Sequence, residues 1–198
     1  MKDQLIISVG REYGSGGHEI AQKLADWYHL PLYDHNLLDE MALKHGMDKE
    51  ILEEFDEKKR NPFLSRTVRG MSSSPEHNVA HLQFDFIKEK ADEGKSFVIV
   101  GRCSETILRA YPAMISFFIL GDRDEKIERI MRIYQMSRRE AEVLMQEKDF
   151  KRKRYHNSHC PGKWGDSRNY DFSINSSKLG IDETVKIMAQ YIDARRAQ

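Results

Sequence analysis

An apolar run near the start of the chain leads directly into a cluster of glycines. The run from Leu5 to Val9 has the composition of a short strand that is buried in a parallel sheet. Behind the glycines, apolar residues recur at helical spacing until Pro31 ends the pattern. A strand, a glycine-rich turn and a helix in this order form the context of a phosphate-binding loop, in which backbone N–H groups and a helix N-terminus converge on an anion.

The glycine-rich turn runs from Arg11 to His18 and departs from the common phosphate-binding pattern G-x-x-x-x-G-K-[ST]. With the pattern aligned on Gly16, the lysine position holds Gly17 and the hydroxyl position holds His18. Because that lysine neutralises the β- and γ-phosphates, another cation has to replace it, or catalysis is lost. Arg11 is the first candidate and Lys23 the second, while an ordinary tight turn is the alternative for the whole segment. The residues predicted to hold a nucleotide are Tyr13, Gly14, Ser15, Gly16, Gly17, His18 and Glu19.

Short apolar runs alternate with helical patterns along the rest of the chain. The further predicted strands are Leu32–Tyr33, Phe97–Val100, Ile115–Leu120 and Tyr170–Ile174. Predicted helices cover about residues 76–93, 124–134, 137–155 and 181–191, with two short helices in 35–57 and a loop in 58–76. This alternation predicts an α/β fold, a five-stranded parallel sheet with helices on both faces. Ligands of such sheets bind at the carboxyl ends of the strands.

Composition excludes several classes of protein. Lys and Arg total 32 and Asp and Glu total 32, so the chain lacks the basic excess of a nucleic-acid-binding protein. Its two cysteines, Cys103 and Cys160, form no disulfide framework and suit a reducing compartment. The N-terminal apolar run is too short for a signal sequence or a membrane span. We therefore expect a cytoplasmic protein that binds neither nucleic acid nor membrane.

Several segments together resemble the cytidylate kinase-like family, a divergent branch related to bacterial cytidylate kinases. The segments follow the family's order: Ile7–Ala21, Pro31–Asp34, Ile99–Cys103, Trp164–Asp166, Asn169–Asp171 and Ile174–Asp182. In that family the lysine-less Gly-Ser-Gly-Gly loop is the usual form. The resemblance implies a three-layer P-loop kinase fold in a single domain over 1–198. It also implies a helical insertion on the acceptor side, about 35–95, and a lid, about 137–168.

The resemblance implies phosphoryl transfer from ATP, with Mg²⁺, to a nucleoside monophosphate such as CMP or to a similar small acceptor. A non-catalytic nucleotide-binding regulator with a degenerate loop and a kinase of a non-nucleotide small molecule remain alternatives. Cytidylate kinases carry Asp where this chain has Cys103, so a carboxylate that contacts the base is missing. The sequence leaves the oligomeric state open, with a homodimer as one alternative.

Three positions behind predicted strands are candidates for substrate binding. The resemblance places Asp34 near the sugar of the acceptor, although capping the following helix is the alternative. Arg102 can hold an acceptor phosphate with two parallel hydrogen bonds, although a structural ion pair is the alternative. The resemblance places the polar run Asn175–Ser177 near the nucleotide base, with a plain turn as the alternative.

The densest basic run, Lys148–Arg154, lies in the long predicted helix of the lid. Lids of nucleotide kinases close over the phosphates and supply cations to the charge that develops during transfer. Lys148 and Arg152 are i,i+4 neighbours that could approach one anion together. A solvated helix face is the alternative for the run. The residues predicted to be catalytic are Arg11, Lys148, Lys151, Arg152 and Arg154.

His156, His159 and Cys160 follow the basic run. A structural zinc site takes four ligands, usually as two pairs, and no second pair is evident in the sequence. The sequence therefore predicts no metal site.

Overall fold

The computed structural model describes residues 4–34, 37, 41, 67–68, 71–72 and 75–198. The chain divides into two compact units, one made of Met1–Leu32 and Ser96–Gln198 and the other of Tyr33–Lys95. The helices predicted in 35–57 and most of the loop predicted in 58–76 lie outside the described residues. The division into insertion and lid stays a prediction.

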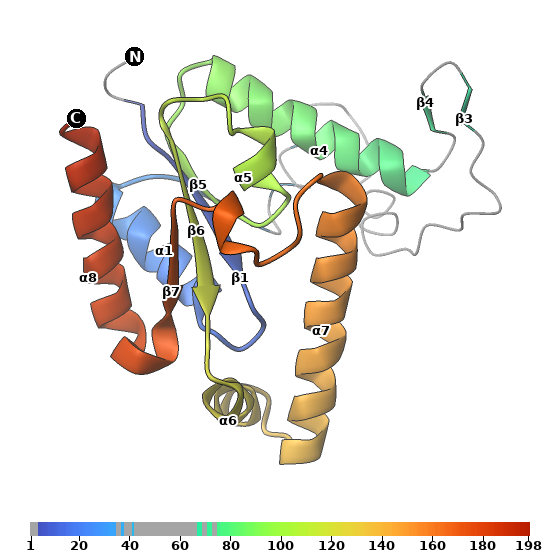
Figure 1. Ribbon diagram of the computed structural model, residues 1–198, viewed down its shortest axis with the longest axis vertical. Coiled ribbons are helices and arrows are strands. Elements are labelled where there is room, and N and C mark those ends of the chain that lie inside the picture. Colours follow the sequence, from blue (N-terminus) through green and yellow to red (C-terminus); the bar gives the residue numbers. More distant parts are fainter. Residues whose placement is uncertain (1–3, 35–36, 38–40, 42–66, 69–70, 73–74) are drawn as a thin grey trace. The chain divides into compact units, whose positions relative to one another are not determined.

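A five-stranded sheet forms the centre of the fold (Figure 1). Its strands, in spatial order, are β2 (Leu32–Tyr33), β5 (Phe97–Val100), β1 (Ile6–Arg11), β6 (Met114–Leu120) and β7 (Phe172–Asn175). Strand β1 pairs in parallel with β5 and with β6, and β6 pairs in parallel with β7. The carboxyl ends of β1, β5, β6 and β7 therefore meet at one edge, as the sequence predicted.

The central strands are continuous apolar runs because both faces of the sheet are covered. Side chains of α1 (Gly17–Tyr28) and α8 (Ser176–Arg196) share one core with alternate residues of the strands, among them Ile7, Val9, Ile20, Leu24, Phe117, Val185 and Met188. On the other face Ser8 Oγ lies 2.7 Å from Ser104 Oγ of α5 (Ser104–Ile107). There Phe118 packs against Trp164, with ring centroids 5.4 Å apart. The predicted three-layer fold is thus confirmed.

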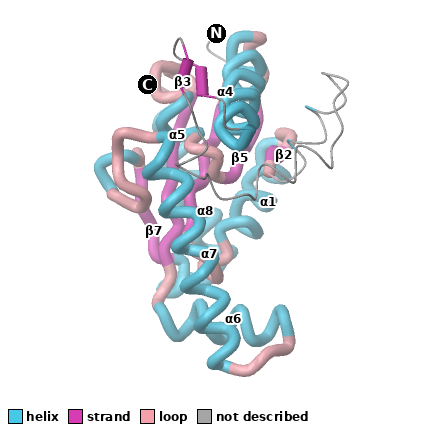
Figure 2. Tube along the Cα trace, turned by 90° about the vertical axis from the view of Figure 1, so that its right-hand side faces the viewer, coloured by secondary structure: helices cyan, strands magenta, loops and turns pink. Residues whose placement is uncertain are grey.

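Two helices follow the sheet at its carboxyl edge (Figures 1 and 2). The arrow of β6 points towards α6 (Arg123–Tyr134), and α7 (Arg138–His159) returns from there along the sheet. Ser137 begins α7 with a capping box, in which its hydroxyl accepts the Glu140 N–H and the Glu140 carboxylate binds back. Buried Ile127, Ile130, Ala141 and Met145 hold α6 and α7 together.

Three helix boundaries differ from the sequence prediction, among them the end of α8, which lies at Arg196 rather than at 191. Helix α7 continues to His159, because its last turn is anchored by the buried His156. Helix α8 begins at Ser176 rather than at Ile181, since the Asn175 side chain caps the Ser177 N–H. The predicted helix began only after Gly180, where φ is 74° and the observed helix is kinked. A short 3₁₀ helix, η1 (Ser167–Asn169), precedes β7.

The second unit contains helix α4 (Pro75–Asp92) and the antiparallel strand pair of β3 (Thr67–Val68) and β4 (Met71–Ser72). Phe84, Phe86 and Ile87 are buried on α4, and Tyr33 meets the Phe86 ring edge-on at 6.3 Å. Among the described helices of both units, none combines the length and the apolar composition needed to cross a membrane.

Candidate functional site

The glycine-rich loop joins β1 to α1 in a conformation that only glycine adopts readily. Gly14 and Gly16 have φ angles of 84° and 79°. A Cβ on Gly16 would lie 2.3 Å from Ile181 Cδ1, and one on Gly14 would lie 2.8 Å from the Lys126 carbonyl. Helix α1 begins at Gly17, so its first N–H groups have no acceptor within the helix. The loop therefore has the geometry of an anion-binding site at a helix N-terminus.

A buried lysine that the sequence analysis missed lies against this loop. Lys126 of α6 is 7% exposed, and its Nζ donates to Glu12 Oε2 at 2.8 Å. The same carboxylate oxygen accepts the Gly121 N–H at 3.2 Å. Lys126 Nζ also lies 3.9 Å from Asp149 Oδ2 of α7. The loop is thus fixed between α6 and α7 by one cation and two carboxylates.

One face of α7 is directed at the loop. After Ala141 and Met145, the same helical stripe carries Asp149 and Arg152. Asp149 Oδ1 accepts the Tyr13 N–H at 2.6 Å. Burial raises the pKa of Asp149, while the Tyr13 N–H and the charge of Lys126 act in the opposite direction.

Of the four basic residues predicted to act from α7, Arg152 is brought to the loop. Its Nη1 donates to the Arg11 carbonyl at 3.3 Å, and its guanidinium lies over the Tyr13 ring at 5.2 Å. Arg154 lies instead over the Phe150 ring, at 5.9 Å. Lys148 and Lys151, the other two residues predicted to be catalytic, are exposed. Helix rotation thus separates Arg152 from the other three.

The turn behind β5 is strained. Gly101, Arg102 and Cys103 have successive φ angles of 75°, 57° and 56°. Each left-handed residue other than glycine costs about 1–2 kcal/mol. Ser104 holds the turn closed, because its hydroxyl donates to the Gly101 carbonyl at 2.8 Å. Strain of this kind concentrates at functional sites, and the role of Arg102 in acceptor binding stays a prediction.

Arg11 extends from the loop to this strained turn. A Cβ added to Gly17 would lie 2.5 Å from Arg11 Cβ, and one added to Gly101 would lie 2.4 Å from Arg11 Nη1. The arginine therefore crosses from the end of β1 to the end of β5, with Gly17 against its Cβ and Gly101 against its guanidinium. Lys23, the second candidate cation, instead pairs with Asp182 at 2.9 Å on the surface.

The strain at Arg102 gives a prediction that separates conformation from chemistry. Arg102→Gly and Arg102→Ala both remove the guanidinium, but only glycine relieves the left-handed strain. We expect the free energy of unfolding of Arg102→Gly to be roughly 0.5–1 kcal/mol higher than that of Arg102→Ala. This difference allows for the more flexible unfolded chain of the glycine variant. Urea denaturation of both variants measures the difference. Equal stability would contradict a strained turn.

A pocket of about 390 Å³ adjoins the loop. Gly14 and Ser15 form one wall, and α6 forms another with Arg129 and Arg132. The turn into α8 closes it, where the Ser176 hydroxyl donates to the Ser15 carbonyl at 2.6 Å. The pocket is lined by Gly14, Ser15, Glu125, Glu128, Arg129, Arg132, Ser176, Ser177, Gly180 and Ile181.

Three further predicted residues, His18, Glu19 and Asp34, have fewer described contacts with the loop. His18 and Glu19 are exposed on the first turn of α1, and Glu19 pairs with Arg129. Asp34 belongs to the second unit, where it is buried and its carbonyl accepts the Leu37 N–H at 3.4 Å. Its role in acceptor binding stays a prediction.

The chain is similar to known proteins in sequence and in fold. The sequence model of the cytidylate kinase-like family matches residues 6–178. An uncharacterized protein from Eubacterium ventriosum ATCC 27560 is 42% identical, with a TM-score of 0.77 over 96% of this chain and 99% of that one. No curated protein matches.

More distant structures share the fold. A shikimate kinase from Bacteroides thetaiotaomicron is 14% identical, with a TM-score of 0.57 over 96% of this chain and 98% of that one. A shikimate kinase from Acinetobacter baumannii, solved in complex with shikimate, is 12% identical, with a TM-score of 0.54 over 100% and 97%.

Proposed function

This chain belongs to the cytidylate kinase-like family, and from that premise we propose that it transfers a phosphoryl group from ATP to a nucleoside monophosphate such as CMP or to a similar small acceptor. The fold and the family mark it as a kinase-like phosphotransferase. Donor, acceptor and the roles of individual residues belong to the proposal.

The pocket beside the glycine-rich loop is the main support for binding of the donor nucleotide. Its volume of about 390 Å³ lies within the range of small-ligand sites. Because loop and pocket share Gly14 and Ser15, a triphosphate on the loop would leave its nucleoside in the pocket. Ser176 and Ser177 would then offer hydroxyl groups to the nucleoside.

Magnesium would arrive with the nucleotide. Mg²⁺ is held by one or two carboxylates together with phosphate oxygens, and it supplies positive charge to the transferred group. Glu12 and Asp149 place carboxylates directly at the loop, so they are the residues that would hold the ion, in competition with the ammonium of Lys126.

Cations from outside the usual lysine position support the transfer step. In-line phosphoryl transfer depends mostly on positioning and charge stabilisation, so the source of the charge can change. Arg129 lies beside Gly16, Arg11 reaches the turn behind β5, and Arg152 joins them from α7. Arg102 would hold the acceptor at the end of β5.

A nucleotide-binding regulator would need the loop and the pocket but no cation from the lid. The contact of Arg152 with the loop therefore favours catalysis over regulation. Buried Cys103, 3% exposed, offers a base no carboxylate, so acceptors other than CMP belong in the test.

The deciding experiment is a coupled assay of ADP formation from Mg²⁺–ATP against a panel of nucleoside monophosphates. We expect acceptor-dependent turnover, reduced about 10²-fold or more by Arg11→Ala, as for the loss of one group that stabilises transition-state charge. Lys23→Ala is the matched control, because its surface ion pair lies off the site. ATP binding without acceptor-dependent turnover would favour a regulator, and absence of ATP binding would refute the loop assignment.

A further inference from the structure

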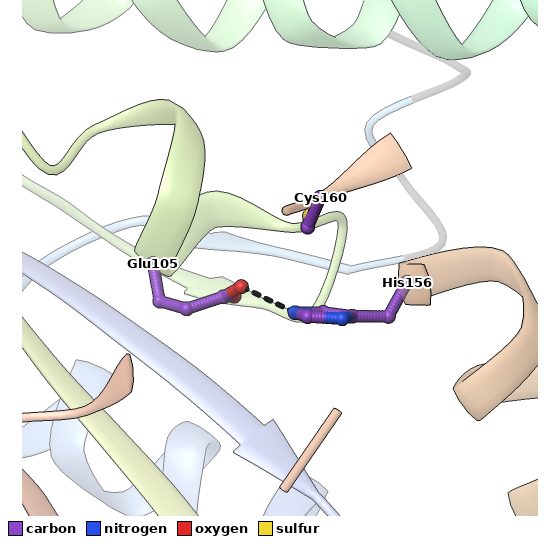
Figure 3. A group of neighbouring side chains, drawn as sticks. All are labelled: Glu105, His156 and Cys160. Carbon is purple, nitrogen blue, oxygen red and sulfur yellow. Dashed lines mark hydrogen bonds and ion pairs between the residues drawn. The ribbon is translucent and has the colours of Figure 1, made fainter. Parts of the chain in front are cut away.

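Three buried side chains of metal-binding type meet where α7 ends (Figure 3). His156 and Cys160 continue the inward stripe of α7, and Glu105 comes from α5. His156 Nε2 lies 2.7 Å from Glu105 Oε1, with side-chain exposures of 5% and 3%. The ligand atoms of all three residues lie within 4.8 Å of one another.

This cluster is separate from the phosphate-binding loop. At 1.5 Å rise per residue, His156 and Cys160 lie about 6 Å and 12 Å further along the helix direction than Arg152. Nothing in the proposed phosphoryl transfer uses them. Burying a carboxylate beside an imidazole and a thiol is costly unless the groups are paired or bind a metal.

Cys103 lies beside the three and brings a second sulfur, although its Sγ lies outside the 4.8 Å group. Cys103 is buried, and its side chain forms a hydrogen bond with Cys160. The four groups come as two pairs that are close in sequence. Cys103 directly precedes α5 and Glu105 lies in it, whereas His156 and Cys160 lie at the end of α7. The sequence analysis grouped Cys160 with His156 and His159 and did not connect Cys103 with Glu105 as a second pair. His159 Nδ1 lies 2.8 Å from the Tyr155 carbonyl.

The surroundings of His156 set its ring as metal sites do. Asn157 Oδ1 accepts the Trp164 N–H at 2.9 Å, which orients the amide oxygen, and this oxygen lies 3.4 Å from His156 Nδ1. Nε2 forms a hydrogen bond with Glu105 Oε1, and with Nδ1 turned to the Asn157 oxygen it is the ring nitrogen that would bind a metal. Metal-binding histidines commonly donate their second N–H to such a carbonyl oxygen. A metal ion between Nε2 and Oε1 would take the place of the proton in this hydrogen bond.

We propose that Glu105, His156 and Cys160 bind one Zn²⁺ ion as a structural site, with Cys103 as the fourth ligand. Mixed sulfur, nitrogen and oxygen ligands in a closed set of four suit Zn²⁺, whereas Mg²⁺ and Ca²⁺ prefer oxygen alone. Zinc bonds of about 2.0–2.1 Å in a tetrahedron separate nitrogen and oxygen by about 3.3 Å. Nε2 and Oε1 therefore move apart by roughly half an ångström when the ion enters.

Such an ion would link two parts of the phosphotransferase site. Cys103 belongs to the strained turn with Arg102, and His156 lies on the helix that carries Arg152. A zinc ion between them would hold the base of α7 against the turn behind β5.

The test is zinc binding by the full chain, purified without a histidine tag. We expect one Zn²⁺ per chain by elemental analysis after gel filtration, and thiolate-to-metal absorption with tetrahedral bands when Co²⁺ replaces it. His156→Gln and Cys160→Ser should each weaken binding by more than about 100-fold, beyond the loss from an outer-shell partner. His159→Gln, the matched control on the same turn, should bind as the unaltered chain does.

Two results would overturn the site. Absence of zinc and of cobalt–thiolate absorption in the unaltered chain would leave a hydrogen-bonded cluster without metal, and this result needs no variant to fold. Full zinc binding by folded Cys160→Ser, with folding checked by circular dichroism, would place the ion elsewhere. If Cys103 is the fourth ligand, the Cys103→Ser variant should lose one of the two thiolate contributions to the cobalt absorption. An unchanged spectrum would remove Cys103 from the site.

Discussion

Arg152→Ala is expected to lower kcat for phosphoryl transfer by about 10²- to 10³-fold, the usual loss when one group that stabilises transition-state charge is removed. Arg154→Ala should change kcat by less than about threefold, because an exposed charge contributes little. The two arginines lie on the same helix with equal charge. Only Arg152 contacts the loop, through the Arg11 carbonyl and the Tyr13 ring.

Steady-state kinetics with the best acceptor of the panel, at constant ionic strength, measure both variants. A loss confined to kcat would show that Arg152 acts on the transferred group, and a loss confined to KM would indicate ground-state binding. Arg152→Lys should recover part of the rate, since an ammonium keeps the charge but not the planar geometry. Equal losses in Arg152→Ala and Arg154→Ala would mean that the basic run acts as diffuse charge.

The fold could be predicted because its signals are local. Leu5–Val9 and Phe97–Val100 are continuous apolar runs, and such runs identify buried strands of a parallel sheet. The glycines from Gly14 to Gly17 mark the turn by their own conformational freedom. Strand order and the meeting of the carboxyl edges then follow from the general rules for parallel sheets.

The site was harder to predict because it depends on helix rotation. Charged residues occur on every face of α7. Its sequence pattern therefore did not indicate that Arg152 points inward and Arg154 outward. A signal did exist, since Ala141, Met145, Asp149 and Arg152 lie on one stripe. Glu105 lies outside any predicted element, and only the tertiary fold brings it to His156.

Lys126 was missed for a related reason. It lies on the face of α6 that carries Ile130, one helical turn away, yet a lysine there is ordinarily expected to reach solvent. The structure instead buries its ammonium between Glu12 and Asp149. Lys126 is therefore an addition to the cations found next to the loop.

Lys126→Met should lower the free energy of unfolding by about 2–3 kcal/mol, a drop in Tm of roughly 5–10 °C for a chain of this size. Methionine keeps the stem that packs against Gly14 and Gly121, so the change isolates the charge. The variant leaves the carboxylates of Glu12 and Asp149 near each other without the ammonium, with only 24% and 20% of their side chains exposed. That partial exposure is why the expected loss lies below the about 3–5 kcal/mol of a fully buried pair.

Lys23→Met provides the comparison, because its ion pair with Asp182 is largely exposed and should be worth less than about 1 kcal/mol. Adding Glu12→Gln to Lys126→Met should restore part of the lost stability, since removing both charges leaves no uncompensated carboxylate at that contact. Chemical denaturation of the unaltered chain, Glu12→Gln, Lys126→Met and the double variant gives the coupling energy between Glu12 and Lys126. If Lys126→Met were as stable as Lys23→Met, the ion pair would not hold the loop, and the shape of the loop would have to come from its glycines alone. If it unfolds early and also loses ATP binding, the conformation of the loop depends on a cation contributed by α6.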